Sequence, residues 1–131
     1  MLLKSLTALL ALLYLGNGSH MLWDPAGWYD GIPGITASGP MNAHFIRDIG
    51  FIYALSGVAY FAALWRWPRR AAWLALGAAW PTLHALFHLA EWATHGLPPG
   101  AALAAEGLGV VAPAAVGIVI AGLAQRAPRA R

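Results

Sequence analysis

Four long apolar stretches, separated only by short polar or glycine-rich junctions, limit what this chain can fold into. They cover about residues 2–23, 43–65, 71–95 and 101–125. A helix needs roughly 20 predominantly apolar residues to cross a bilayer, and each stretch is long enough. Charged residues make up 10% of the 131 residues, whereas soluble domains carry about 25%. The sequence therefore predicts an all-α integral membrane protein that forms a single transmembrane domain over 1–131.

The junctions favour an up-down bundle of four transmembrane helices, in which helices adjacent in sequence pack together. Residues 24–42 are rich in glycine and proline, so we expect an ordered, non-helical outer loop there. Asn42 is suited to cap the second helix, and Pro68 ends any continuous helix between the second and third stretches. The sequence GLPPG at 96–100 predicts a tight turn before the fourth helix.

The first stretch has a second interpretation, as a secretory signal peptide. Lys4 precedes a long apolar run, which is how the charged leader and hydrophobic core of a signal peptide are arranged. The residues that follow match a small-residue cleavage site poorly, and the apolar character resumes at 21–23. We therefore expect a retained transmembrane helix, with cleavage of residues 1–18 as the alternative.

The basic residues indicate the orientation of the helices, because cytoplasmic junctions of membrane proteins are enriched in Lys and Arg. They gather at both termini and between the second and third stretches: Lys4; Arg66, Arg69 and Arg70; Arg126, Arg129 and Arg131. The junctions 24–42 and 96–100 contain neither Lys nor Arg. We expect both termini in the cytoplasm and these two junctions outside. Topology thus explains the formal net charge of +3, and no nucleic-acid partner is predicted.

Every histidine and every carboxylate is predicted to lie in the outward half of the bundle or in the outer loop. His44 and Asp48 are four residues apart at the start of the second helix and share one face. His84, His88 and Glu91 share a face in the outer half of the third helix. Because the second and third helices are expected to be neighbours, these five side chains are predicted to converge.

This convergence predicts a metal site. Ionisable groups inside a membrane cost about 2.5–3.5 kcal/mol each on insertion scales, so they normally face a partner or a cavity. Imidazole and carboxylate groups are ligands for Fe, Cu and Zn. We therefore predict an outward-facing site in which the five side chains bind a metal ion. If the protein is an enzyme, that ion would activate water or dioxygen, and the sequence names no substrate.

Three alternatives are open. A b-type haem would use His44 with His84 or His88 as axial ligands, among aromatic side chains. A structural or assembly subunit of a larger membrane complex, such as a respiratory one, would use the polar groups to hold the bundle together or to meet a partner or a second copy. A small metal or proton carrier is disfavoured, because the inner half has few polar residues. The lack of cysteine excludes c-type haem attachment and iron–sulfur clusters.

Two more polar residues receive ordinary interpretations. Glu106 is expected to face water at the start of the fourth helix, where a carboxylate suits the helix dipole. Trp92 is expected to belong to an aromatic belt at the membrane surface. Pro81 lies inside the third stretch and is expected to kink its helix toward the second.

Two segments, GPMNAHFIRDIGFIYALSG (39–57) and HALFHLAEW (84–92), resemble segments of small four-span inner-membrane proteins of proteobacteria. Those proteins share an outer loop ending in G-P-x-N-x-H-F-x-R-D-x-G and a later histidine-rich helix. The resemblance implies four helices in a bacterial inner membrane, with the outer junctions and the His/carboxylate site facing the periplasm. It assigns no activity, but it marks a signature at Asn42, His44, Arg47, Asp48, His84 and His88.

Overall fold

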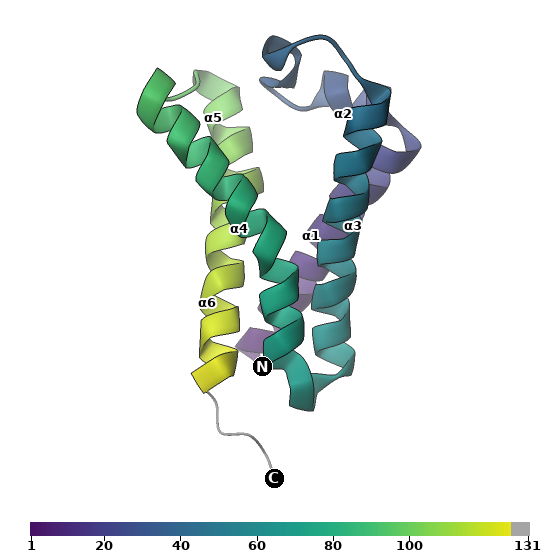
Figure 1. Ribbon diagram of the computed structural model, residues 1–131, viewed down its shortest axis with the longest axis vertical. Coiled ribbons are helices and arrows are strands. Elements are labelled where there is room, and N and C mark those ends of the chain that lie inside the picture. The colour runs from purple at the N-terminus through teal and green to yellow at the C-terminus, as the bar shows by residue number, and fades with distance from the viewer. Residues whose placement is uncertain (127–131) are drawn as a thin grey trace.

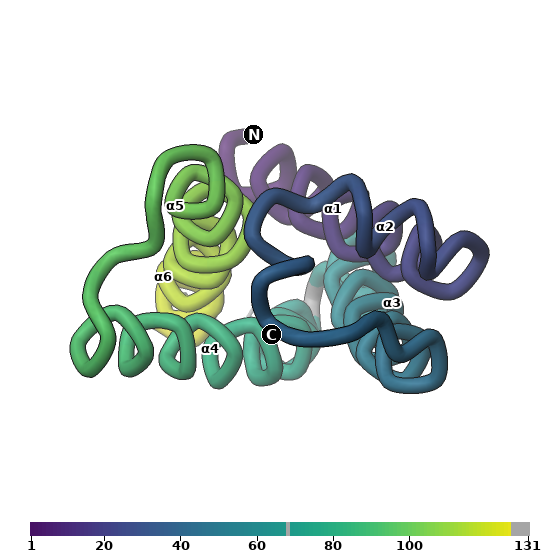
Figure 2. Tube along the Cα trace, turned by 90° about the horizontal axis from the view of Figure 1, so that it is seen from above, coloured from purple at the N-terminus to yellow at the C-terminus, as the bar shows by residue number. Residues whose placement is uncertain are grey.

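The computed structural model describes residues 1–126, and every regular element in that range is a helix. Four long helical units lie side by side and alternate in direction (Figures 1 and 2). They are α1 (Leu2–Trp23), α3 (Ala43–Trp65), α4 (Arg70–His95) and a C-terminal unit made of α5 (Gly100–Glu106), the π-helical segment η3 (Gly107–Val111) and α6 (Ala112–Arg126). The helices predicted from the apolar stretches are therefore present, with bounds close to those expected.

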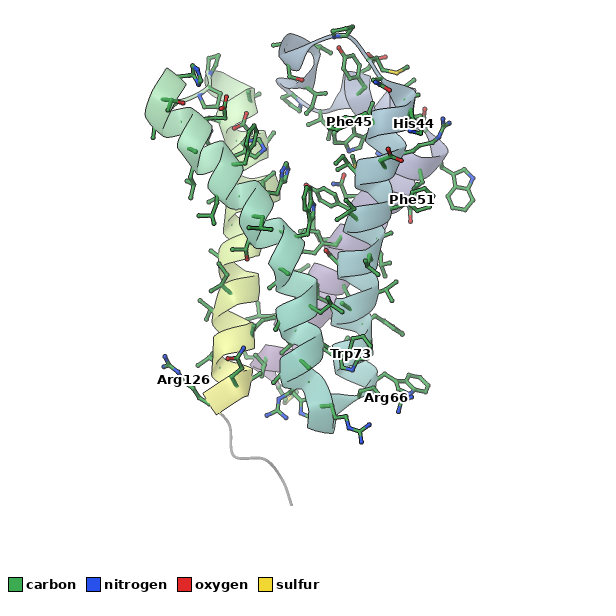
Figure 3. All side chains as sticks on the ribbon, in the orientation of Figure 1. His44, Phe45, Phe51, Arg66, Trp73 and Arg126 are labelled. Carbon is green, nitrogen blue, oxygen red and sulfur yellow. The ribbon has the colours of Figure 1, made fainter. Side chains whose placement is uncertain are left out.

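The bundle has two ends with different chemistry. Arg66 and Arg126 lie at one end (Figure 3), which we call the basic end, together with the short helix η2 (Trp67–Arg69). The residues 24–42 and the turn before α5 lie at the other, which we call the loop end (Figure 1). Arg129 and Arg131 lie outside the described residues.

The junction 24–42 is not the non-helical loop expected from its composition. It contains α2 (Pro25–Gly31) and a 3₁₀ turn, η1 (Ile35–Ser38). The Asp24 carboxylate accepts a hydrogen bond from the backbone N–H of Gly27 at 2.9 Å and so caps α2. Pro25 occupies the first helical turn, where its missing N–H would have had no intrahelical acceptor. A local cap therefore overrides the glycine and proline content.

Hydrogen bonds hold this junction against the bundle. The Trp28 indole N–H donates to the side-chain oxygen of Asn17 on α1 at 2.9 Å. The Tyr29 hydroxyl donates to the backbone oxygen of Gly39. As predicted, Asn42 caps α3, because its side-chain oxygen accepts from the N–H of Phe45 at 3.1 Å. The junction is thus ordered and packs onto the loop end of the bundle.

Close helix packing through glycine joins α1 to α3. A Cβ atom on Gly18 would lie 2.6 Å from the backbone nitrogen of Ala54 and 2.7 Å from the oxygen of Gly50. A Cβ atom on Gly57 would lie 2.7 Å from the backbone nitrogen of Leu15. Side chains larger than hydrogen therefore cannot fit without moving the helices apart, which is how small residues bring membrane helices together.

Tyrosine rings fill the interior between the glycine contacts. Tyr14 stacks on Tyr60 with ring centroids 5.7 Å apart, and both side chains are fully buried. The Tyr60 ring lies against Gly77 of α4, and its hydroxyl reaches Gly117 of α6. The basic half is therefore a closely packed core that contains the buried hydroxyls of two tyrosines, in a region where the sequence predicted few polar residues.

The helices separate toward the loop end. Figure 1 shows α4 leaning away from α3 in that half. Pro81 lies inside α4, where its ring nitrogen cannot donate to the carbonyl of Gly77. The expected kink would direct α4 toward α3, but the loop half of α4 lies away from it, beside the C-terminal unit (Figures 1 and 2).

Three helices among the described residues are long and apolar enough to cross a membrane: α1, α3 and the C-terminal unit Gly100–Arg126. Their length and composition are those of a membrane protein. With 26 residues α4 is long enough, but its three histidines and one glutamate make it less apolar. The prediction of a fourth span is therefore not confirmed.

Candidate functional site

A cleft of about 1,170 Å³ lies between the two halves of the bundle at the loop end. Residues of α1, α3 and the 24–42 junction line one side, and residues of α4 and the C-terminal unit line the other. Its lining is mostly apolar, with a few polar side chains. Binding sites for small molecules have this character and occupy about 300–1,000 Å³. The cleft is thus large enough for a ligand.

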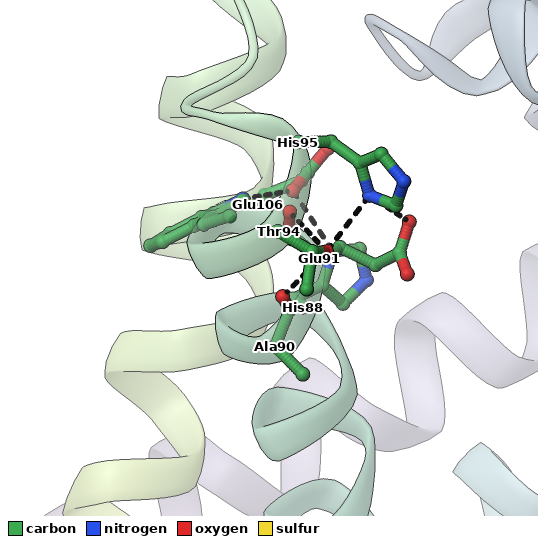
Figure 4. Close-up of polar contacts among 7 residues, drawn as sticks. His88, Ala90, Glu91, Thr94, His95 and Glu106 are labelled. Carbon is green, nitrogen blue, oxygen red and sulfur yellow. Dashed lines mark hydrogen bonds and ion pairs between the residues drawn. The ribbon is translucent and has the colours of Figure 1, made fainter.

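Three side chains on α4 and α5 form a hydrogen-bonded cluster at the cleft, and two of them, His88 and Glu106, line it. His88 Nδ1 lies 2.8 Å from Oε2 of Glu106, and the indole N–H of Trp92 donates to the same oxygen at 2.7 Å. Figure 4 shows the contact between His88 and Glu106. The side chains of His88 and Glu106 are only 19% and 25% exposed. We call His88, Trp92 and Glu106 the polar cluster.

The polar cluster continues into a group of aromatic rings. The rings of His84 and His88 meet edge to face with centroids 4.8 Å apart. His84 stacks on Trp80, with centroids 5.8 Å apart and planes 10° from parallel, and Tyr53 of α3 meets its edge at 6.1 Å. The indole nitrogen of Trp80 is buried and has no hydrogen-bond partner. His84, His88 and Trp80 all line the cleft.

The other predicted ligands lie apart from this cluster. His44 and Asp48 pair with each other on α3 at 3.4 Å, and their side chains are 90% and 56% exposed. Glu91 pairs with His95, one turn further along α4, at 3.4 Å (Figure 4). Neither pair lines the cleft, and Figure 3 shows His44 near the loop end of α3.

Hence the five predicted metal ligands do not form one ligand set. Among residues 1–126, no group of three or more His, Asp or Glu side chains is placed to hold a metal ion. The structure brings His84 and His88 together at the cleft, and it pairs His44 with Asp48 elsewhere, on α3. The prediction of a metal ion, and the haem alternative that pairs His44 with one of these histidines, are not confirmed.

Arg47, another residue of the sequence signature, has a structural role. Its Nε–H donates to the backbone oxygen of Leu22 at 3.2 Å, which ties the start of α3 to the end of α1. Such a contact satisfies a carbonyl group at a helix terminus. The signature N-x-H-F-x-R-D thus holds a helix cap and an interhelical contact in addition to its exposed pair.

Sequence reasoning missed the carboxylate of the polar cluster. Glu106 was expected to face water, but it accepts hydrogen bonds from His88 and Trp92. The sequence did contain a signal. His88 and Glu106 lie nine residues before and nine residues after Leu97, at the centre of the turn between two antiparallel helices. Residues equally far from such a turn lie at similar depth, so the pairing follows from the hairpin geometry.

The arrangement has a defined hydrogen-bonding capacity. When His88 is neutral and Nδ1–H donates to Glu106, its Nε2 atom is a free acceptor. When His88 is protonated, Nε2–H becomes a donor. The polar cluster is therefore able to bind either a hydroxyl or a carbonyl group, and to exchange a proton with it.

Comparison of the chain with known protein families, curated proteins and solved structures finds no match.

Proposed function

We propose that this chain is a four-span protein of a bacterial inner membrane that binds a small amphipathic molecule in a cleft facing the periplasm. The observation that carries the proposal is the large apolar cleft with the polar cluster in its wall. Apolar pockets with a few well-placed polar groups are the usual form of a ligand site. The ligand's apolar part would contact the cleft walls, and its polar group would meet His88.

The charge distribution supports the orientation. The basic end holds Arg66, Arg70 and Arg126, and the positive-inside rule assigns such an end to the cytoplasm. Lys4 and Arg70 both lie over the ring of Trp67, with their charged groups 4.9 Å from its centroid. Aromatic rings with cations beside them suit the membrane surface. In the proposed orientation the loop end, and with it the cleft, faces the periplasm.

The buried position of the polar groups supports α4 as the fourth span. Ionisable residues in transmembrane helices normally face the bundle interior or a cavity rather than lipid. His84 and His88 line the cleft, while Glu91 and His95 lie in the last turns of the helix, near the proposed membrane surface. The lower apolarity of α4 is therefore explained by its contribution to the site.

A metal ion is the second candidate. Two imidazoles with ring centroids 4.8 Å apart lie beside a carboxylate that is already hydrogen-bonded to one of them. In metal sites a carboxylate often orients a ligating histidine in this way. A metal would therefore use His84 and His88 as ligands, with Glu106 orienting His88 and the remaining positions filled by water or by the ligand.

The proposal is tested on protein purified in mild detergent without added histidine tags. Bound small molecules are extracted with organic solvent and identified by mass spectrometry, while elemental analysis and an absorption spectrum detect a metal or haem. We expect about one organic molecule per chain. A stoichiometric metal without it would favour the second candidate, and a stable protein partner with neither would favour the subunit alternative.

A matched pair of glycine variants links the molecule to the cleft. Gly109 lines the cleft, and Gly122 lies on α6 away from it. A Cβ atom at either position would meet no other atom within 4 Å, so both sites accept a side chain. We expect Gly109→Phe to abolish the bound molecule and Gly122→Phe to retain it. Equal retention by both variants would refute the cleft as the binding site.

A further inference from the structure

The charge of the cleft lining limits what it can bind. Among the described lining residues there is no Lys or Arg, and the one carboxylate is that of Glu106. An anionic head group, such as a lipid phosphate or a fatty-acid carboxylate, would meet no Lys or Arg there and would lie near the Glu106 carboxylate, which is unfavourable. The lining therefore selects against the anionic lipids of the surrounding membrane and favours an uncharged ligand.

The shape of the wall favours a planar ring. Trp80 and His84 present two nearly parallel rings, and Tyr53 approaches from α3 across the cleft. Phe45 and Phe87 also line the cleft and have exposed rings. Aromatic rings pack well against other planar rings in stacked or edge-to-face geometry. A flat aromatic or quinonoid ring fits such walls better than a bulky polar group.

One hydrogen-bonding group at the same wall fits an oxygen substituent on that ring. His88 lines the cleft, and its Nδ1 atom is occupied by Glu106. Its Nε2 atom is therefore left to meet a ligand oxygen, as an acceptor for a hydroxyl when the imidazole is neutral and as a donor to a carbonyl when it is protonated.

We propose that the ligand is a membrane quinone or its quinol: an uncharged ring with two oxygen substituents on a long apolar tail. The proposal rests on the proposed function of the cleft and names the class of molecule bound there. The ring lies among Trp80, His84 and Tyr53, and one ring oxygen meets the Nε2 atom of His88. The volume of about 1,170 Å³ holds the ring and part of the tail, and the apolar lining suits that tail.

The test measures binding of a benzoquinone carrying a ten-carbon tail to the detergent-purified chain by isothermal titration calorimetry. Decanol, decanoate and decyltrimethylammonium have the same tail with an uncharged, an anionic and a cationic head. We expect a single saturable site for the quinone, with each of the three other compounds at least tenfold weaker. Equal or tighter binding of decanol would show that the tail alone is recognised, and stronger binding of the cation would show recognition of charge. Either result would overturn the quinone proposal.

Two carboxylate variants of α4 and α5 test the role of the polar cluster. Glu106→Gln removes the charge that supports His88, and we expect quinone binding to weaken about tenfold or more, as hydrogen bonds to charged groups do when lost. Glu91→Gln removes an exposed carboxylate of α4 outside the cleft and should leave binding unchanged. If the two variants change quinone binding equally, the polar cluster has no specific role in binding the quinone.

The two proposals fail in different ways. If the quinone does not bind, yet Gly109→Phe still removes another extracted molecule, the quinone class is wrong and the binding cleft stands. If Gly109→Phe leaves quinone binding and the extracted molecule unchanged, the cleft itself is not the site.

Discussion

Replacement of Gly18 by alanine should destabilise the bundle by forcing α1 and α3 apart. A Cβ atom at this position would lie 2.6 Å from the Ala54 nitrogen, whereas ordinary contact begins at 3.4 Å. Both atoms closest to the new methyl group belong to the α3 backbone, so no side-chain rotation relieves the clash. Overpacking of this kind costs about 1–3 kcal/mol.

Gly16 is the matched control, one half-turn away on the same helix. A Cβ atom there would meet no other atom within 4 Å. Alanine in place of glycine favours a helix by roughly 0.5–1 kcal/mol, and this gain applies to both variants. The difference in unfolding free energy between Gly18→Ala and Gly16→Ala therefore isolates the clash and should equal about 1–3 kcal/mol.

The measurement is unfolding of the detergent-solubilised chain by added sodium dodecyl sulfate, followed by circular dichroism. Gly18→Ala should unfold at a lower denaturant fraction than the wild type, and Gly16→Ala at the same or a higher one. Coincident midpoints for the two variants would refute close contact of α1 and α3 at this glycine.

Three further predictions concern other parts of the chain. Asp48→Asn should change the unfolding free energy by less than about 0.5 kcal/mol and leave the extracted molecule in place, since its ion pair is exposed; loss of that molecule would give the pair a role that the structure does not show. Trp28→Phe removes the bond to Asn17 and should lower the stability of the 24–42 junction by about 1 kcal/mol, seen as faster amide hydrogen exchange confined to that junction; unchanged exchange would show that the bond does not hold it. A periplasm-active reporter should be silent when fused to the C-terminus and active when fused after Leu97 of a truncated chain; the opposite pattern would invert the orientation.

Helix positions were predictable because they depend on local properties of the sequence. The apolar stretches have the length of a span, and Asn42 caps α3 as expected from its side chain. The structure of the junction 24–42 was harder to predict, because its glycine and proline content favours a non-helical loop whereas the Asp24 cap favours a helix. The hydrogen bond from Gly27 to Asp24 stabilises α2, and the helix forms.

The site depended on helix rotation, which the spacing of residues does not fix. His44 and Tyr53 are nine residues apart, or two and a half turns at 3.6 residues per turn, and therefore lie on opposite faces of α3. Tyr53 lines the cleft, so His44 faces away from it. Spacing shows that His44 and Asp48 share a face, but not whether that face meets α4.

Glycine contacts set the rotation of α3. Gly50 and Gly57 lie against α1, with Met21 and Leu15 as their nearest neighbours, and this contact fixes which side of α3 remains for α4. In the C-terminal unit, the π-helical segment Gly107–Val111 follows Glu106 directly. A π turn changes the angular position of the residues on either side of it relative to each other, so the face of Glu106 could not be read from the pattern of α6.

The close packing of the basic half and the separation of the loop half divide the molecule into two regions with different tolerance to mutation. Substitutions around Tyr60, Gly77 and Gly117 should lower the amount of folded protein, because those atoms are in direct contact. Substitutions in the cleft wall, such as Leu83 or Leu108, should alter what is bound while folding is retained, because both side chains are exposed. Such a division allows a chain of this size to acquire a new ligand specificity by changes in one half while the other half keeps it folded.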